Sequence, residues 1–123
     1  MQYKTGLSDN EWYVMQVLWD KPGATLRNLC DALSGEKGWS KHAISSFLKR
    51  MQEKGAVAVN ESGKVRQYFA VWSKEETLRE ETHSILERIY QGNLMLMVSN
   101  AVQQQELTGE EIQQLKDMLD GIQ

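Results

Sequence analysis

The sequence contains one cysteine, one proline and two histidines among 123 residues, and these scarcities exclude several classes of protein. A single cysteine, Cys30, allows no disulfide within the chain and is typical of a reducing cytoplasm. No apolar run approaches the roughly 18–20 residues of a membrane-spanning helix. The segment MQYKTGLSDNEW lacks the apolar stretch of an export signal. We therefore expect a cytoplasmic protein that does not insert into a membrane.

Groups that perform catalysis or bind metals are equally scarce. Catalysis needs a nucleophile or an acid–base pair with partners within reach. His42 and His83 are far apart in sequence and fall on different predicted helices, and Cys30 falls on an apolar helical stripe. No phosphate-binding loop or zinc ligand pattern is present. We predict that the chain is not an enzyme and has no catalytic residue, no metal site and no cofactor.

Charge is unevenly distributed along the chain. Residues 1–72 contain ten Lys and Arg against seven Asp and Glu, a balance of +3. Residues 73–123 contain four against ten, a balance of −6, and the two sum to the net charge of −3. Either the first part contacts an anion or its surface charge varies by chance.

Three helices are predicted in the first half of the chain. Ser8 with Glu11 forms a capping box that begins a helix over residues 8–20, and Pro22-Gly23 ends it. Apolar residues spaced three and four apart predict a second helix over residues 25–35, with Gly35 as its stop. Ser40 begins a third helix, which ends before the glycine at position 55.

The pattern then changes to a β-hairpin followed by more helix. Val57 and Val59, a polar turn and residues 65–72 predict two strands. Further capping boxes begin helices at Ser73 and Thr108, and Gly92 kinks or breaks the first of these. The fold class is therefore mainly α with a small β-hairpin. This order predicts a winged helix-turn-helix DNA-binding domain over residues 1–72 and a helical dimerisation region over residues 73–123.

The third helix has an outward face suited to a DNA groove. Short polar side chains let a helix approach base edges closely, and cationic side chains bind phosphates. For an isolated helix, an ordinary solvated face is the better explanation of the pattern; the helix count, the hairpin and the charge asymmetry favour DNA. We predict base contacts from His42, Ser45 and Ser46, and phosphate contacts from Lys41, Lys49, Arg50, Lys64 and Arg66.

The second half has more apolar residues than one side of a monomeric helix requires. Residues 94–98 read LMLMV, and such a surface is usually buried against a partner. The alternative is that this run packs back on its own domain. We predict a homodimer interface formed by Leu86, Ile89, Leu94, Met97, Val98, Ile112, Leu115 and Leu119.

Four segments in this order resemble the penicillinase-repressor family of bacterial transcriptional repressors. They are LSDNEWYVMQVLWDKPGAT, GWSKHAISSFLKRMQEKGAV, VRQYFAVWSKEE and GNLMLMVSNAVQQQELTGEEIQQLKDMLD. The resemblance covers nearly the whole chain. It implies a homodimeric repressor that binds a palindromic operator in double-stranded DNA, controlling genes for β-lactam resistance or related stress responses.

The resemblance also bears on how the repressor is released. Copper-responsive members have a cysteine-rich motif near the C-terminus, and no cysteine follows Cys30 here. β-Lactam-responsive members are cleaved at an Asn-Phe bond after a membrane sensor-protease is activated. The corresponding position is Asn100-Ala101, which lacks the Phe. Asn100 is therefore either part of a cleavage site or a polar residue of a dimer helix.

Two further points remain open from the sequence. Family members often have Pro-Lys-Thr after the serine that begins the third helix, whereas this chain has Lys41-His42-Ala43, so the operator sequence cannot be transferred. Some winged domains bind proteins instead of DNA, and their third helix tends to lose its positive charge. A protein-interaction module without specific DNA binding is therefore the alternative function.

Overall fold

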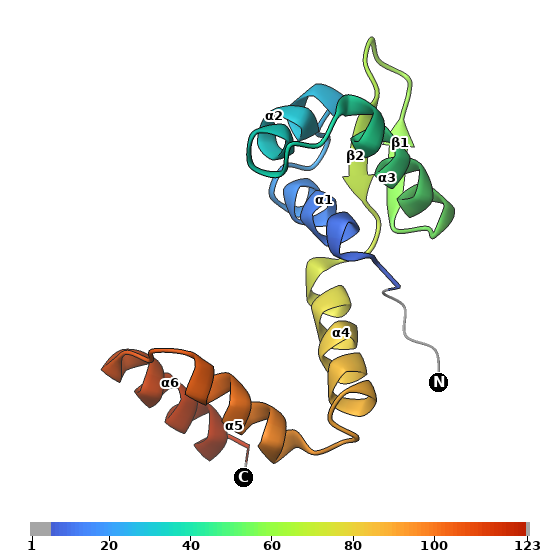
Figure 1. Ribbon diagram of the computed structural model, residues 1–123. Coiled ribbons are helices and arrows are strands. Elements are labelled where there is room, and N and C mark those ends of the chain that lie inside the picture. Colours follow the sequence, from blue (N-terminus) through green and yellow to red (C-terminus); the bar gives the residue numbers. More distant parts are fainter. Residues whose placement is uncertain (1–5, 123) are drawn as a thin grey trace. The chain divides into compact units, whose positions relative to one another are not determined.

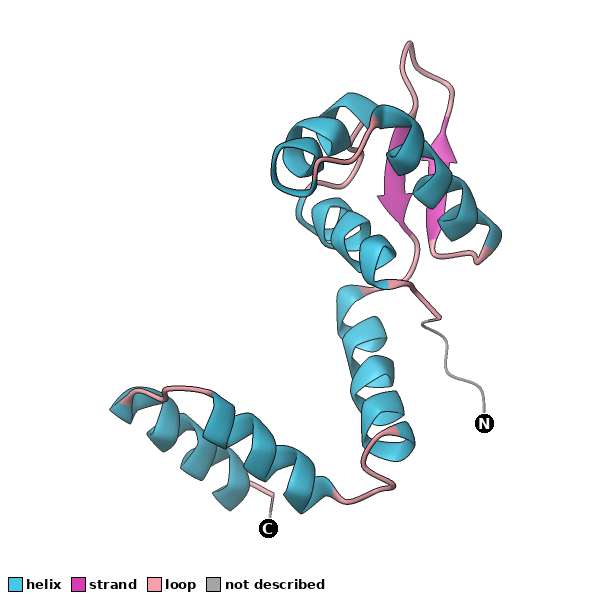
Figure 2. Cartoon of the chain, viewed as in Figure 1, coloured by secondary structure: helices cyan, strands magenta, loops and turns pink. Residues whose placement is uncertain are grey.

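The computed structural model describes residues 6–122, apart from the side chain of Glu36. Residues 1–5 of the N-terminal stretch considered above lie outside this part. Within it, Figures 1 and 2 show three helices, a hairpin and three further helices. In chain order the elements are α1 (Asp9–Asp20), α2 (Leu26–Lys37), α3 (Lys41–Glu53), β1 (Val57–Asn60), β2 (Gln67–Ala70), α4 (Lys74–Arg88), α5 (Leu94–Gln104) and α6 (Gly109–Asp120).

The chain forms a winged helix-turn-helix followed by helical segments, which confirms the predicted fold class. Two compact units, Met1–Glu81 and Thr82–Gln123, divide within α4. The sequence placed the division before that helix, after residue 72. That earlier boundary concerned where DNA binding ends and dimerisation begins, and it stays a prediction.

Local capping chemistry starts the helices where the sequence predicted. Ser8 Oγ accepts a hydrogen bond from the Glu11 backbone N–H at 3.2 Å, and a Glu11 carboxylate oxygen accepts one from the Ser8 N–H at 2.8 Å. Thr108 and Glu111 make the same reciprocal pair at the start of α6. Each box satisfies backbone donors that the first helical turn leaves without partners.

The end of α2 differs from the prediction. The helix does not stop at Gly35 but continues to Lys37, and Gly38 caps it in the left-handed conformation with φ of 68°. Its N–H donates to the Ser34 carbonyl at 2.8 Å. Glycine adopts this backbone conformation without the steric cost that a Cβ brings, so Gly38 ends the helix and Gly35 lies within it.

The hairpin is antiparallel and is tied to the helices. Val57 pairs with Ala70 and Asn60 with Gln67, so the second strand is shorter than the predicted span of 65–72. An isolated bridge joins Ala24 to Tyr68 just before α2, with a hydrogen bond of 2.8 Å from the Tyr68 N–H to the Ala24 carbonyl. This bridge fixes the start of α2 beside the hairpin of β1 and β2, which with its connecting loop is the wing of the fold.

The core of the first unit lies between the three helices and the hairpin. Helices α1, α2 and α3 contact one another, and the strands contact α1 and α3. The Trp19 indole N–H also donates to the Trp72 carbonyl at 2.9 Å, which closes the end of the hairpin on α1. The buried apolar residues are Val14, Met15, Leu18, Ala24, Leu29, Leu33, Ile44, Leu48, Met51, Ala56, Val57 and Tyr68.

Among its described residues, 82–122, the second unit has no comparable core. Gly92, with φ of 81°, lies between α4 and α5 and marks the break that the sequence anticipated. Helices α5 and α6 are described throughout, and neither contains a buried residue. Most of their apolar side chains are therefore exposed within a single chain, and Met97 and Leu115 are half-buried.

Candidate nucleic-acid interface

Helix α3 is oriented by its cap and by its buried face. Ser40 Oγ accepts a hydrogen bond from the Ala43 N–H at 3.1 Å and so fixes the first turn. Ile44, Leu48 and Met51 are buried in the core, with at most 1% of their surface exposed. This packing turns the opposite face of the helix to solvent.

The predicted base-contacting residues lie on or beside that outward face. His42 is exposed, and Ser45 and Ser46 are half-buried. None of the three has a long side chain that would hold the helix away from a groove floor, which suits close approach to base edges. Their base contacts stay predictions.

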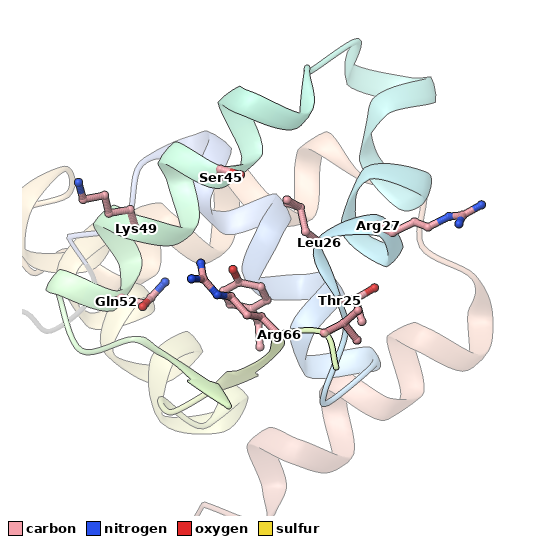
Figure 3. A pocket seen from close by; sticks show the side chains of 9 residues that line it. Thr25, Leu26, Arg27, Ser45, Lys49, Gln52 and Arg66 are labelled. Carbon is pink, nitrogen blue, oxygen red and sulfur yellow. The ribbon is translucent and has the colours of Figure 1, made fainter. Parts of the chain in front are cut away.

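A cavity of about 610 Å³ lies between α3, the start of α2 and the wing. Figure 3 shows its lining residues, which come from these three parts of the first unit. Leu26, Val65 and Tyr68 supply its apolar lining. Its polar lining comes from Thr25, Arg27, Ser45, Lys49, Gln52 and Arg66. Three cationic residues on one cavity form a place where a phosphate can be held.

The start of α2 adds to the positive character of this cavity. Thr25 and Asn28 form a reciprocal cap, with hydrogen bonds of 3.0 and 3.1 Å. The first turn of a helix carries a partial positive charge from its aligned peptide dipoles. Arg27 lies in this turn and is exposed, so dipole and side chain favour the same ligand, an anion.

The wing contributes an arginine that already has an acidic partner. Arg66 Nε lies 2.9 Å from Glu61 Oε1, and both side chains are more than half exposed. Exposed ion pairs of this kind are weak and exchange readily. Arg66 lines the same cavity as Lys49 of α3, so two of the predicted phosphate-binding residues border one cavity. Lys64 lies in the same loop as Arg66 and is exposed.

Arg50 does not line the cavity. Its Nε lies 3.6 Å from Glu11 Oε2, and its guanidinium carbon lies 5.3 Å from the centre of the Phe47 ring. Lys54 is the C-cap residue of α3, and its Nζ lies 2.5 Å from Glu11 Oε1 and 2.7 Å from the Gly6 carbonyl oxygen. Of the predicted phosphate-binding residues, Lys49 and Arg66 therefore line the cavity, whereas Lys41, Arg50 and Lys64 do not.

Glu11 remains ionised at neutral pH. Burial acts to raise the pKa of its carboxyl group, but the Lys54 hydrogen bond, the Ser8 N–H and the Lys54 charge together lower the pKa below its usual value of 4.5. Its side chain is only 1% exposed. A buried negative charge thus lies against Arg50 of α3 and Lys54 at the C-cap of that helix.

Sequence reasoning missed several of these residues. Thr25, Arg27 and Gln52 belong to the cavity but were not predicted as site residues. Arg27 had a local signal, since it follows a cap residue at a predicted helix start. Glu11 was predicted only as a capping residue, and no role in the site was predicted for Lys54.

The predicted dimer residues lie mostly on the surface of the second unit. Ile89, Leu94, Val98, Ile112 and Leu119 are each more than 40% exposed. The remaining three, Leu86, Met97 and Leu115, are half-buried. Burial in a single chain therefore leaves most of this apolar set available, and its role in dimerisation stays a prediction.

The predicted cleavage position lies within α5. Asn100 and Ala101 are exposed helical residues that line a shallow cavity of about 420 Å³ in the second unit, together with Tyr90 and Met97. Asn100 Nδ2 lies 3.5 Å from the Tyr90 hydroxyl oxygen. No contact singles this bond out for hydrolysis among the described residues, so cleavage stays a prediction.

Comparison with known proteins identifies the family. The family model for the penicillinase repressor matches residues 7–121, which is nearly the whole chain. The chain belongs to the penicillinase-repressor family. It is accordingly a DNA-binding transcriptional repressor, and the family consists of repressors and not of enzymes.

Two curated relatives show how closely the chain matches its family. It is 32% identical to the penicillinase repressor of Bacillus licheniformis over 114 residues, covering 93% of this chain and 89% of the relative. It is 26% identical to the methicillin resistance regulatory protein MecI of Staphylococcus aureus strain N315 over 113 residues, covering 92% of each.

A solved structure of the repressor BlaI gives the structural counterpart of the winged domain. The monomeric form of Bacillus licheniformis BlaI, in complex with the blaP half-operator, matches with a TM-score of 0.54 and 28% identity. The match covers 62% of this chain and 93% of that one. Within the described part of the repressor, no helix is long and apolar enough to cross a membrane.

Proposed function

We propose that this repressor binds a palindromic operator as a homodimer, with α3 in the major groove and the wing beside it. The observation that carries the proposal is the cavity beside α3 that Arg27, Lys49 and Arg66 all line. One DNA backbone runs along that cavity, and the start of α2 faces it with its positive dipole end. His42, Ser45 and Ser46 then read base edges.

We assign the other edge of α3 to the second DNA strand. A helix in the major groove lies between two sugar–phosphate backbones. Arg50 lies five residues after Ser45 and therefore about 140° further round the helix axis. It is 54% exposed, and we assign it to a phosphate of the strand opposite the cavity.

The proposed dimer forms through the second unit. Leu94 is 52% exposed, Met95 74% and Leu119 64%, although all three are large apolar residues. An excess of exposed large apolar residues of this kind supports a partner surface. A two-fold dimer supplies that surface from a second copy and presents two α3 helices to half-sites related by the same symmetry.

The regulated genes and the release step are proposed from the relatives. One relative is a methicillin resistance regulator and another a penicillinase repressor, which supports β-lactam-resistance or related stress genes as targets.

We propose release in the cytoplasm by cleavage at Asn100-Ala101, after activation of a membrane sensor-protease. Because this bond is helical, α5 must unwind locally before a protease can accept it as an extended strand. Mass spectrometry of the repressor before and after β-lactam exposure of producing cells tests this step; an intact chain after derepression excludes it.

Selection of bound fragments from random duplex DNA tests the proposed function. The expected product is an inverted repeat that the repressor binds with an affinity falling steeply as salt rises, because phosphate contacts release counterions. Weak binding to all DNA without an enriched sequence would instead favour the protein-interaction module.

A further inference from the structure

The Glu11 carboxylate does more than cap α1. One oxygen, Oε1, accepts from the Ser8 N–H at 2.8 Å and from Lys54 Nζ at 2.5 Å. The other, Oε2, is buried, lies 3.6 Å from Arg50 Nε and has no hydrogen-bond partner within the described structure. The cap uses only the first oxygen, so the second is left facing an arginine of α3.

Helix capping does not require this burial. Glu111 forms the same capping box at the start of α6 while remaining exposed, and α2 uses the neutral Asn28 in the equivalent role. A carboxylate loses favourable hydration when it is buried, so burial of a charge calls for compensation by partners. At Glu11 that compensation comes from the C-terminal end of α3, where the capping residue Lys54 lies 43 residues further along the chain.

The two cationic partners of Glu11 differ in their freedom. The Lys54 ammonium group is held by two acceptors, the Glu11 carboxylate and the Gly6 carbonyl oxygen at 2.7 Å. Arg50 has its Nε beside Glu11 and the Phe47 ring near its guanidinium, yet 54% of its side chain is exposed. Lys54 therefore braces the end of α3 against α1, while Arg50 is restrained on one side and open on the other.

We propose that Glu11 is a positioning residue for operator binding, because its pairing with Arg50 Nε orients the guanidinium so that its remaining donors meet a DNA phosphate. An arginine fork held in one orientation loses less freedom when it binds an anion than an unrestrained one. This inference rests on the proposed function. It adds the residue that orients Arg50 for its contact with the DNA strand opposite the cavity. Glu11 itself does not touch DNA.

The test compares Glu11→Gln, Arg50→Ala and the double variant by operator affinity and its salt dependence. The glutamine oxygen keeps the acceptor for Ser8 and Lys54 but removes the charge facing Arg50. Loss of one phosphate contact lowers the slope of log affinity against log salt by roughly 0.9 per bound chain. We expect both single variants to lose about this slope and the double variant to lose no more, because the two residues act through one contact.

Other outcomes overturn the inference. Tighter binding by Glu11→Gln would mean that Glu11 merely neutralises positive charge, and additive losses would mean that it acts only on the fold. Glu75→Gln provides the matched control, since it removes one exposed carboxylate from the first turn of α4. That control should leave the slope unchanged. Urea unfolding of every variant confirms that a folded protein is being compared.

A second comparison decides the matter if Glu11→Gln does not fold. Arg50→Lys keeps the charge but lacks the Nε–H and the planar fork. If orientation matters, this variant binds operator as weakly as Arg50→Ala; if only charge matters, it binds like the parent, and the inference fails. A parent chain that enriches no operator would overturn the proposed function itself. A parent that binds normally alongside an unaffected Arg50→Ala overturns the phosphate contact of Arg50 and with it the role of Glu11, but not operator binding.

Discussion

Replacement of Arg66 by alanine is the sharpest perturbation of the cavity. Arg66 comes from the wing and lines the same cavity as Lys49 of α3 and Arg27 of α2. In the described structure it pairs with Glu61, in an exposed ion pair of 2.9 Å that a phosphate can replace. The core does not depend on it, so the variant should fold and lose one phosphate contact per chain.

The expected loss follows from the number of contacts. A dimer on a palindromic site has two Arg66 residues, and each lost phosphate contact lowers the salt slope by roughly 0.9, giving a total of about 1.8. Between about 50 and about 200 mM salt, the parent should therefore lose about twelvefold more affinity than the variant. A single chain bound per operator would give half that slope change.

The assay is a fluorescence-anisotropy titration of the selected operator at several salt concentrations. Arg79→Ala serves as the arginine control, because Arg79 is an exposed residue of α4 that does not line the cavity. The double variant Arg66→Ala with Glu61→Gln keeps the net charge of the parent and should retain the reduced slope. An unchanged slope in Arg66→Ala would refute the assignment of the cavity to a DNA phosphate.

Three further outcomes are expected. Glu61→Gln should bind operator up to about fivefold more tightly in the same titration, since an exposed ion pair competing for Arg66 contributes at most about 1 kcal/mol; unchanged or weaker binding would contradict this competition. Because the folded-state pKa of Glu11 is lowered, its stabilising effect is present above the usual value of 4.5 and is lost as the pH falls below that value. The unfolding free energy from urea titrations should therefore fall more in the parent than in Glu11→Gln between about pH 6 and about pH 3.5. Equal losses would show that other carboxyl groups dominate. Leu94→Asp should sediment as a folded monomer and bind operator poorly, because Leu94 is 52% exposed in the single chain; a dimer as stable as the parent's would remove Leu94 from the interface.

Helix starts could be predicted because their signals are local. Ser8 with Glu11 and Thr108 with Glu111 are three residues apart, and both form the expected reciprocal bonds. The end of α2 was less determined, since glycines at 35 and 38 offer the same permissive backbone. Packing of the loop before α3 decided between them, as Ser34 Oγ donates to the Trp39 carbonyl at 2.9 Å and keeps the last turn helical.

The candidate site was only partly predictable because it joins distant segments. Periodicity gave the outward face of α3, including Ser45 and Lys49. It could not indicate that Arg27 and Arg66 would share a cavity with them, since the bridge from Ala24 to Tyr68 creates that proximity. The burial of a charged capping residue was equally invisible, because its cationic partners follow about forty residues later in the chain.

The most direct test of the account is a map of backbone amide chemical shifts on addition of the selected operator. The account predicts the largest changes in α3, in the wing loop around Arg66 and in the first turn of α2 at Arg27, with Arg50 included among the changes in α3. Changes confined to α5 and α6, or spread evenly over the chain, would contradict the claim that this face binds DNA.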